Sequence, residues 1–218
     1  MKEFQPDLNP QKLSEIETII PGIRPPLPLE SKELYKAIRP ADVSSNISEE
    51  LRKSPRLRKF FKSFAGQVVV DIGPGNALSG YDIALFSKAK AYVGVEPYEF
   101  IRNLEQMLAV ADKMLVTPSP QIPRTAIQAD ALSFFRRLPD KSVSIFASQL
   151  ESVMVQRYSD DLVQEIERVL HPKGVFIEYD SHLHLDRSLF THEIFDREKM
   201  SEGFINLPFE LEKYQPKV

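Results

Sequence analysis

The run VVVDIGPGNALSG, residues 68–80, contains the residue types best suited to ligand binding. A β-branched stretch ends in Asp71, and Gly73 and Gly75 follow in a turn that leads into a predicted helix. Glycine lets the backbone bend sharply and lets a ligand approach where a Cβ would block it. Amide groups at the start of the helix would then donate hydrogen bonds to that ligand. Two glycines in a turn are weak evidence alone, because turns often select glycine.

Two further carboxylates follow the next two predicted strands. Glu96 closes AYVGVE, and Asp130 follows TAIQA. Glu96 could accept hydrogen bonds from two ribose hydroxyls, or it could stabilise the start of a helix near Tyr98. Asp130 could accept from an adenine amino group, or it could cap the next helix. Three acids at the ends of three successive strands, one beside a glycine turn, are hard to explain by independent capping.

The elements that would position these acids alternate between strand and helix from residue 67 onward. The predicted strands are QVVVDI, AYVGVE, TAIQA, SVSIFA and VFIEYD. Helices are predicted over about 76–88, from about 98, over ALSFFRRL, and from a cap at Ser159. This order predicts an α/β fold with a doubly wound, mostly parallel sheet and right-handed crossovers. In such sheets the ligand binds at the carboxyl ends of the strands.

Residues 1–64 are predicted to form an N-terminal helical and extended region, and residues 65–218 the α/β domain. Prolines in PGIRPPLPLE favour extended chain between short helices near 10–19 and 31–38. Apolar residues at helical spacing in SPRLRKFFKSF predict a core-facing helix with a solvated basic face. Contact of this basic face with an anion or a nucleic acid is the alternative. We expect the N-terminal region to fold over the ligand site and to help select the substrate.

Composition excludes several kinds of site. Of the 218 residues, 42% are hydrophobic and 27% charged, which is compatible with a packed core. The net charge of −3 gives no general attraction to nucleic acid. The absence of cysteine excludes disulfides, thiolate zinc sites and cysteine nucleophiles, and the four histidines form no metal-ligand pattern. No apolar run approaches the ~20 residues that span a bilayer, so we expect a cytoplasmic protein without a membrane segment.

Residues 67–181 contain five segments in the order DIGPGN, VGVEP, QADA, SVSIFASQLE and IERVLHPKGVFIEYD. These segments resemble the ordered motifs of class I S-adenosylmethionine-dependent methyltransferases. The resemblance implies a Rossmann-like fold and S-adenosyl-L-methionine as cofactor. The glycine turn would lie along the methionine part, Glu96 would hold the ribose hydroxyls, and Asp130 would meet the adenine edge. The implied cofactor-binding residues are Asp71, Gly73, Pro74, Gly75, Asn76, Glu96, Pro97, Tyr98, Asp130, Ala131, Ser148 and Gln149.

The sequence departs from the family pattern in three places. Ala77 replaces the third motif glycine, and Pro172-Lys173-Gly174 replaces a Pro-Gly-Gly turn. Residues 182–218 offer one clear strand, in GFINLPFELEKY, so the last strands of the sheet are expected to be shortened. Candidates for a general base near the ends of the fourth and fifth strands are Glu151, Tyr179, Asp180 and His182.

The methyl acceptor is expected to be a small molecule or a protein. Amino-group nucleic-acid methyltransferases of the family often carry an Asn- or Asp-Pro-Pro-aromatic run after the fourth strand, and this chain has SQLE there. A nucleic-acid acceptor is therefore not favoured.

Two other functions remain as alternatives. A non-catalytic binding or scaffold protein could keep the same fold and the same turn. A nicotinamide-dependent dehydrogenase would also use a glycine turn, but its GxGxxG pattern is missing, because glycine resumes only at Gly80.

Overall fold

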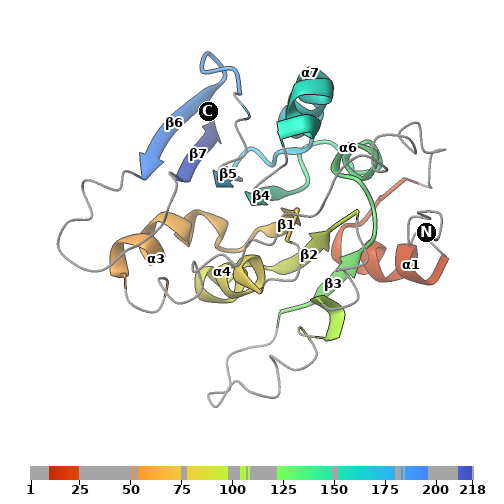
Figure 1. Cartoon of the computed structure of the whole chain (residues 1–218). Coiled ribbons are helices and arrows are strands. Elements are labelled where there is room, and N and C mark those ends of the chain that lie inside the picture. The colour runs from red at the N-terminus through yellow and green to blue at the C-terminus, as the bar shows by residue number, and fades with distance from the viewer. Residues whose placement is uncertain are drawn as a thin grey trace.

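The protein is represented by a computed structural model, in which seven strands form one sheet (Figure 1). The structure describes residues 10–24, 51, 54–74, 78–97, 104–106, 108, 122–148, 152–179, 183, 185–195 and 211–217. Within these residues the strand order is β3-β2-β1-β4-β5-β7-β6. The strands are β1 (Val68–Ile72), β2 (Ala91–Val95), β3 (Arg124–Ile127), β4 (Ser144–Ser148), β5 (Phe176–Tyr179), β6 (Phe190–Phe195) and β7 (Leu211–Pro216).

Strands β1 to β5 pair in parallel, and β7 is antiparallel to both β5 and β6. The doubly wound, mostly parallel sheet predicted from the sequence is therefore confirmed. All five residues of β1 are buried, as expected for a central strand covered on both faces. Because side chains alternate along a strand, Val70 and Asp71 face opposite layers of the core.

Helices cover both faces of the sheet (Figure 1). The core on one face includes residues of α3 (Pro55–Phe61), η2 (Lys62–Phe64) and α4 (Ser79–Ser87). The core on the other face includes residues of α1 (Pro10–Ile19), α6 (Ala131–Phe135) and α7 (Ser152–Val169). None of the described helices is long and apolar enough to cross a membrane.

The two N-terminal helices that the structure describes match their predictions. Helix α1 covers residues 10–19, and α3 buries the apolar stripe of Leu57, Phe60 and Phe61. The helix expected at 31–38 lies outside the described residues. The division of the chain at residue 64 also stays a prediction.

Two predictions about the C-terminal half were wrong. Helix α7 begins at Ser152, so Ser159 lies inside the helix and does not cap it. No proline or glycine interrupts residues 152–158, so nothing in the sequence stops the helix from extending toward its N-terminus. The final strands are also not shortened: β6 and β7 pair over six residues each, from Phe190↔Pro216 to Phe195↔Leu211.

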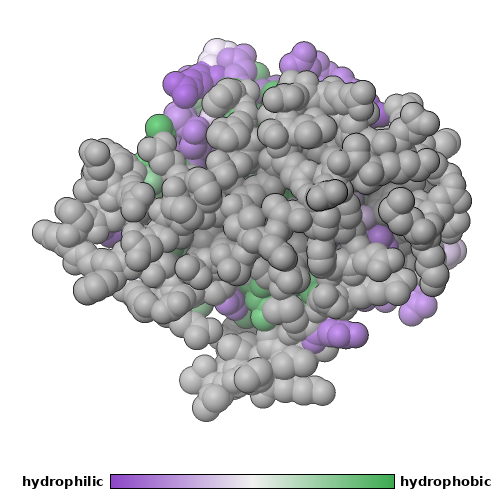
Figure 2. Space-filling view, in the orientation of Figure 1, coloured by the Kyte–Doolittle hydropathy of each residue, from purple (hydrophilic) through white to green (hydrophobic). Residues whose placement is uncertain are grey.

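Hydrophobic atoms reach the surface near β6 and below α4 (Figure 2). Among the described residues, the large hydrophobic side chains that are exposed are Phe86, Leu189 and Ile194. They belong to different elements, and single exposed apolar residues are normal on protein surfaces. The exposure of these residues therefore does not indicate a binding surface for another protein.

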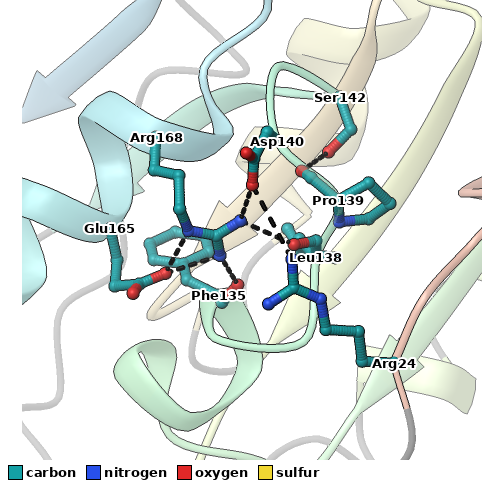
Figure 3. Close-up of polar contacts among 8 residues, drawn as sticks. All are labelled: Arg24, Phe135, Leu138, Pro139, Asp140, Ser142, Glu165 and Arg168. Atoms are coloured by element: carbon teal, nitrogen blue, oxygen red, sulfur yellow. Dashed lines mark hydrogen bonds and ion pairs between the residues drawn. The ribbon is translucent and has the colours of Figure 1, made fainter.

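Arg168, near the end of α7, fastens this helix to the loop before β4 (Figure 3). Its guanidinium donates to the carbonyl oxygens of Phe135 at 2.7 Å and Leu138 at 2.9 Å. It also pairs with Glu165 at 2.6 Å and Asp140 at 2.5 Å. The hydrogen bond from Arg168 lowers the pKa of Asp140. One side chain thus joins the end of α6, the loop before β4 and α7.

Replacing Arg168 by methionine should therefore destabilise the fold. We expect the free energy of unfolding to fall by about 2 kcal/mol, because two carbonyl contacts and two ionic contacts are lost from a partly exposed position. The measurement is urea unfolding at neutral pH. Arg136→Met is the control, since Arg136 pairs with exposed Asp161 at 2.9 Å and should cost less than about 1 kcal/mol. Equal losses in both variants would contradict the role assigned to Arg168.

Candidate functional site

The end of β1 is fastened to the end of β2 by a glycine. Gly73 has a φ of +74°, in the left-handed region that favours glycine. Its N–H donates to the carbonyl of Val95 at 3.0 Å. Pro74, the next residue, is buried. Gly75 and Asn76 lie outside the described residues, so their place in the site stays a prediction.

The ends of β2 and β3 are joined in the same way. The N–H of Glu96 donates to the carbonyl of Ile127 at 3.1 Å, and the N–H of Ala129 donates to the carbonyl of Glu96 at 3.2 Å. The Glu96 residue is 4% exposed. The side-chain amide of Gln128 donates to the carbonyl of Pro97 at 3.3 Å. The carboxyl ends of three strands therefore form one edge, while Tyr98 lies outside the described residues.

Asp71 is a buried acid at this edge. It is 1% exposed, and its Oδ2 accepts a hydrogen bond from the hydroxyl of Tyr92 at 2.8 Å. Its Oδ1 has no hydrogen-bond partner among the described residues. Burial raises the pKa of Asp71 to about 7; the Tyr92 hydrogen bond acts in the opposite direction, and the charge of Glu96 adds to the rise. The group can therefore change its charge near neutral pH.

Gly80 leaves the space that the Asp71 carboxylate occupies. A Cβ built on Gly80 would lie 1.9 Å from Oδ2 of Asp71, so a side chain there would displace the carboxylate. Gly80 is the second residue of α4, whose N-cap residue Leu78 provides no side-chain hydrogen bond. The carboxylate thus lies against the first turn of the helix, where the helix dipole favours negative charge.

Sequence reasoning assigned no role in this arrangement to Tyr92 or to Gly80. A signal was available for Tyr92, because a tyrosine inside a strand buried on both faces needs a hydrogen-bond partner for its hydroxyl. Asp71 is the one acid within the neighbouring strand β1. Gly80 gave no comparable signal, because it looks like an ordinary glycine in a predicted helix.

Asp130 caps α6, as one of its two interpretations predicted. Its Oδ1 accepts from the backbone N–H of Ser133 at 2.7 Å. Its Oδ2 is buried and has no hydrogen-bond partner within the described part of the chain. Contact of Asp130 with an adenine amino group would use this second oxygen, and it stays a prediction. Ala131, the first residue of α6, is also buried.

The side of the site formed by β4 and β5 is only partly described. Ser148 ends β4 in parallel register with Tyr179 of β5. The structure does not describe the side chains of either residue. The same holds for the rest of the predicted set on this side: Gln149, Glu151, Asp180 and His182.

Glu178 is a buried acid on β5 that sequence reasoning missed. It is 2% exposed, and its Oε2 accepts from the backbone N–H of Leu183 at 3.1 Å. This bond holds the chain that follows β5 and gives Glu178 a structural role.

The arrangement offers carboxylate acceptors at the ends of three strands. An ionised carboxylate accepts hydrogen bonds and donates none, which suits hydroxyl and amino groups of a ligand. The buried unpartnered oxygens of Asp71 and Asp130 leave acceptor positions in the described part of this edge. The edge therefore fits a ligand that carries hydroxyl and amino groups.

Comparison with solved structures identifies the fold. The chain is similar to yhhF of Escherichia coli, a proposed methyltransferase, with a TM-score of 0.54 and 11% identity over 83% of this chain and 92% of that one. It is similar to an rRNA methylase of Streptococcus thermophilus, with a TM-score of 0.52 and 13% identity over 82% of this chain and 100% of that one. It is also similar to a proposed methyltransferase of Streptococcus mutans in complex with SAH, with a TM-score of 0.52 and 13% identity over 80% of this chain and 99% of that one.

The sequence matches no family model and no curated protein. At identities of 11–13% the structural likeness establishes the fold alone. The chain has the Rossmann-like fold of class I methyltransferases, as the sequence motifs predicted.

The pKa of Asp71 predicts how stability depends on pH. Because its pKa rises from 3.8 in the unfolded chain to about 7 in the fold, the protonated form is favoured in the fold. This contribution to stability is complete below pH ~4 and is lost as the pH rises toward 7 and above. We expect its loss to lower the free energy of unfolding of the wild type by up to about 2–3 kcal/mol between pH 5 and pH 8.

The measurement is urea unfolding of the wild type and of Asp71→Asn at each pH. The variant should lack this pH-dependent loss, since an amide does not titrate. Asp140→Asn is the control, because the pKa of exposed Asp140 is lowered and this group stays ionised over the same range. Parallel curves for the wild type and Asp71→Asn would contradict the prediction.

Proposed function

We propose that the chain binds S-adenosyl-L-methionine at the carboxyl ends of β1, β2 and β3 and transfers its methyl group to an acceptor. The observation that carries this proposal is the joined edge of Gly73, Glu96 and Ala129, held by three backbone hydrogen bonds. This edge brings Asp71, Glu96 and the segment leading to Asp130 into the order that the sequence motifs require. The methyltransferase fold supports the same assignment at the level of architecture.

Each described residue has a proposed contact that its chemistry suits. The buried carboxylate of Glu96 accepts hydrogen bonds from the two ribose hydroxyls, and Oδ2 of Asp130 accepts from the adenine amino group. The backbone of the turn lies along the methionine part of the cofactor. The remaining proposed contacts are Asp71, Pro74, Gly75, Asn76, Pro97, Tyr98, Ala131, Ser148 and Gln149.

When bound, the cofactor supplies a sulfonium methyl group that is already strongly electrophilic. The protein then has to orient the acceptor in line with the methyl group and to keep water out. A general base is required only if the acceptor must lose a proton, and the proposed candidates are Glu151, Tyr179, Asp180 and His182.

We propose a small molecule or a protein as the acceptor. The rRNA methylase among the similar structures shares the fold at 13% identity, which carries no information about the substrate of this chain. RNA is therefore included as one arm of an acceptor test with radiolabelled S-adenosyl-L-methionine. Transfer of label to RNA would contradict the proposed acceptor class and leave the proposed cofactor unchanged.

Calorimetric titration tests the cofactor directly. The purified chain is titrated with S-adenosyl-L-methionine, with S-adenosylhomocysteine and, as a control, with NAD. We expect binding of the first two ligands and none of NAD. Binding of NAD alone would favour a dehydrogenase, and binding of no ligand would favour a structural or scaffold protein.

Substitution of Glu96 should weaken cofactor binding. Glu96→Ala should reduce the binding free energy by about 1.5–3 kcal/mol, since two charge-assisted hydrogen bonds to ribose are lost. Calorimetry with S-adenosylhomocysteine measures this change. Glu178→Gln is the control, because Glu178 is also a buried acid near the end of a strand and already accepts a backbone hydrogen bond. An unchanged dissociation constant in Glu96→Ala would favour the other interpretation of Glu96, in which it stabilises the start of the next helix.

A side chain at Gly75 tests the turn. Gly75→Val should abolish cofactor binding, because the added side chain enters the ligand space. The fold should stay mostly intact, so a cooperative unfolding transition should still be seen. Calorimetry combined with thermal unfolding separates the two effects. Retained affinity would exclude the turn from the site.

A further inference from the structure

We propose that Tyr92 is a positioning residue of the donor site: its hydroxyl holds the Asp71 carboxylate in place against the first turn of α4 and favours its ionised form. The inference rests on the proposed function, and it assigns a role to a residue outside the sequence motifs of the site. Tyr92 acts through Asp71 and needs no contact with the cofactor.

The position of Tyr92 in β2 explains how its hydroxyl reaches Asp71. In the parallel register Tyr92 lies beside Val69, and Gly94 lies beside Asp71. The tyrosine side chain therefore extends along the sheet, over Gly94, toward the carboxyl end. A Cβ on Gly94 would lie 3.2 Å from the Tyr92 hydroxyl and 2.8 Å from Cδ2 of Leu104. The missing side chain at Gly94 thus makes room for the tyrosine.

A second glycine makes room for the carboxylate. The space next to Oδ2 of Asp71 is the space that a side chain at Gly80 would fill, at 1.9 Å. The hydrogen bond of 2.8 Å between Tyr92 and Asp71 is therefore enclosed by Gly94 on β2 and Gly80 on α4. Both partners are buried, with exposures of 0% for Tyr92 and 1% for Asp71.

Aromatic packing fixes the tyrosine ring. Tyr81 of α4 meets the ring of Tyr92 edge-on, with 5.5 Å between ring centroids. The guanidinium of Arg124, from β3, lies over Tyr81 at 5.5 Å from the ring centroid. The ring is thus held by neighbouring elements, and removal of its hydroxyl alone should leave the packing intact.

The charge of Asp71 depends on opposing influences. Burial and the negative charge of Glu96, at the end of β2, favour the neutral acid. The Tyr92 hydroxyl and the first turn of α4 favour the carboxylate. In the described part of the chain, the other titratable side chains that act on Tyr92 are Tyr81 and Asp82 of α4. Tyr92 is therefore a donor whose loss should leave Asp71 more often protonated at neutral pH.

Protonation would matter for the donor site because it changes the hydrogen bonds that Asp71 can make. An ionised carboxylate accepts at both oxygens, whereas the protonated acid presents a donor on one of them. Oδ1 of Asp71 has no partner among the described residues and remains available as an acceptor. A hydrogen-bond donor that approaches this position is satisfied by the ionised form and not by a protonated oxygen.

The test is calorimetric titration with S-adenosylhomocysteine between pH 6 and pH 9. Tyr92→Phe should weaken binding about tenfold at pH 7, as expected for loss of a hydrogen bond to a charged group. The loss should shrink toward pH 9, where Asp71 ionises without help from Tyr92. Tyr214→Phe is the matched control: Tyr214 is equally buried and donates to Glu212 at 2.7 Å on the far strand β7. Its binding curve should follow that of the wild type.

A double-mutant cycle separates positioning from a general effect on the fold. In an Asp71→Asn background, Tyr92→Phe should cause no further loss of affinity, because the carboxylate through which Tyr92 acts is gone. Gly80→Ala should reproduce the loss without removing any hydrogen-bonding group. The same tenfold loss in both backgrounds, or a loss that does not change with pH, would overturn the inference. Absence of binding by the wild type would overturn the proposed function, and this inference with it.

Discussion

Parallel pairing of β1 with β2 on one side and with β4 on the other is the constraint on which the rest of the structure depends. The chain runs outward from β1 to β2 and β3, then returns to form β4 on the opposite side of β1. All of these strands therefore end at the same edge of the sheet, and the strand order reverses at β1. Asp71, Glu96 and the segment before Asp130 meet because of this register, and no local interaction among their side chains is required.

Buried and paired charges differ between the amino ends and the carboxyl ends of the parallel strands. At the amino edge, before β4, Arg168 neutralises Asp140 and Glu165 and also binds backbone carbonyls. This arrangement lowers the pKa of Asp140 and stabilises the fold. At the carboxyl edge, Asp71 is buried beside a neutral tyrosine and within reach of the charge of Glu96. Such an acid costs stability at neutral pH, which is typical of a functional site.

Periodicity and motif order were sufficient to predict the first five strands, their parallel pairing and the edge of the sheet at which Asp71, Glu96 and the segment before Asp130 meet. They were not sufficient where a helix lacked a stop signal: α7 continues back to Ser152 because no residue between 152 and 158 breaks it. Asp130 retained two interpretations because one carboxylate can cap a helix with Oδ1 and keep Oδ2 for another partner. The contact of Tyr92 with Asp71 depends on the register between two strands, which the sequence of neither strand specifies.

Gly80 and Gly94 lie where glycine is unfavourable for the local secondary structure, and both border the pair of Tyr92 and Asp71. Glycine inside a helix or a strand is unfavourable by about 0.5–1 kcal/mol relative to alanine. At Gly80 an alanine would collide with the Asp71 carboxylate, and at Gly94 it would press on Leu104 and on the Tyr92 hydroxyl. Both glycines thus give up local stability to keep one buried tyrosine–carboxylate pair intact. A side chain at either glycine would therefore press on the hydrogen bond between Tyr92 and Asp71, which makes these four residues one packing unit.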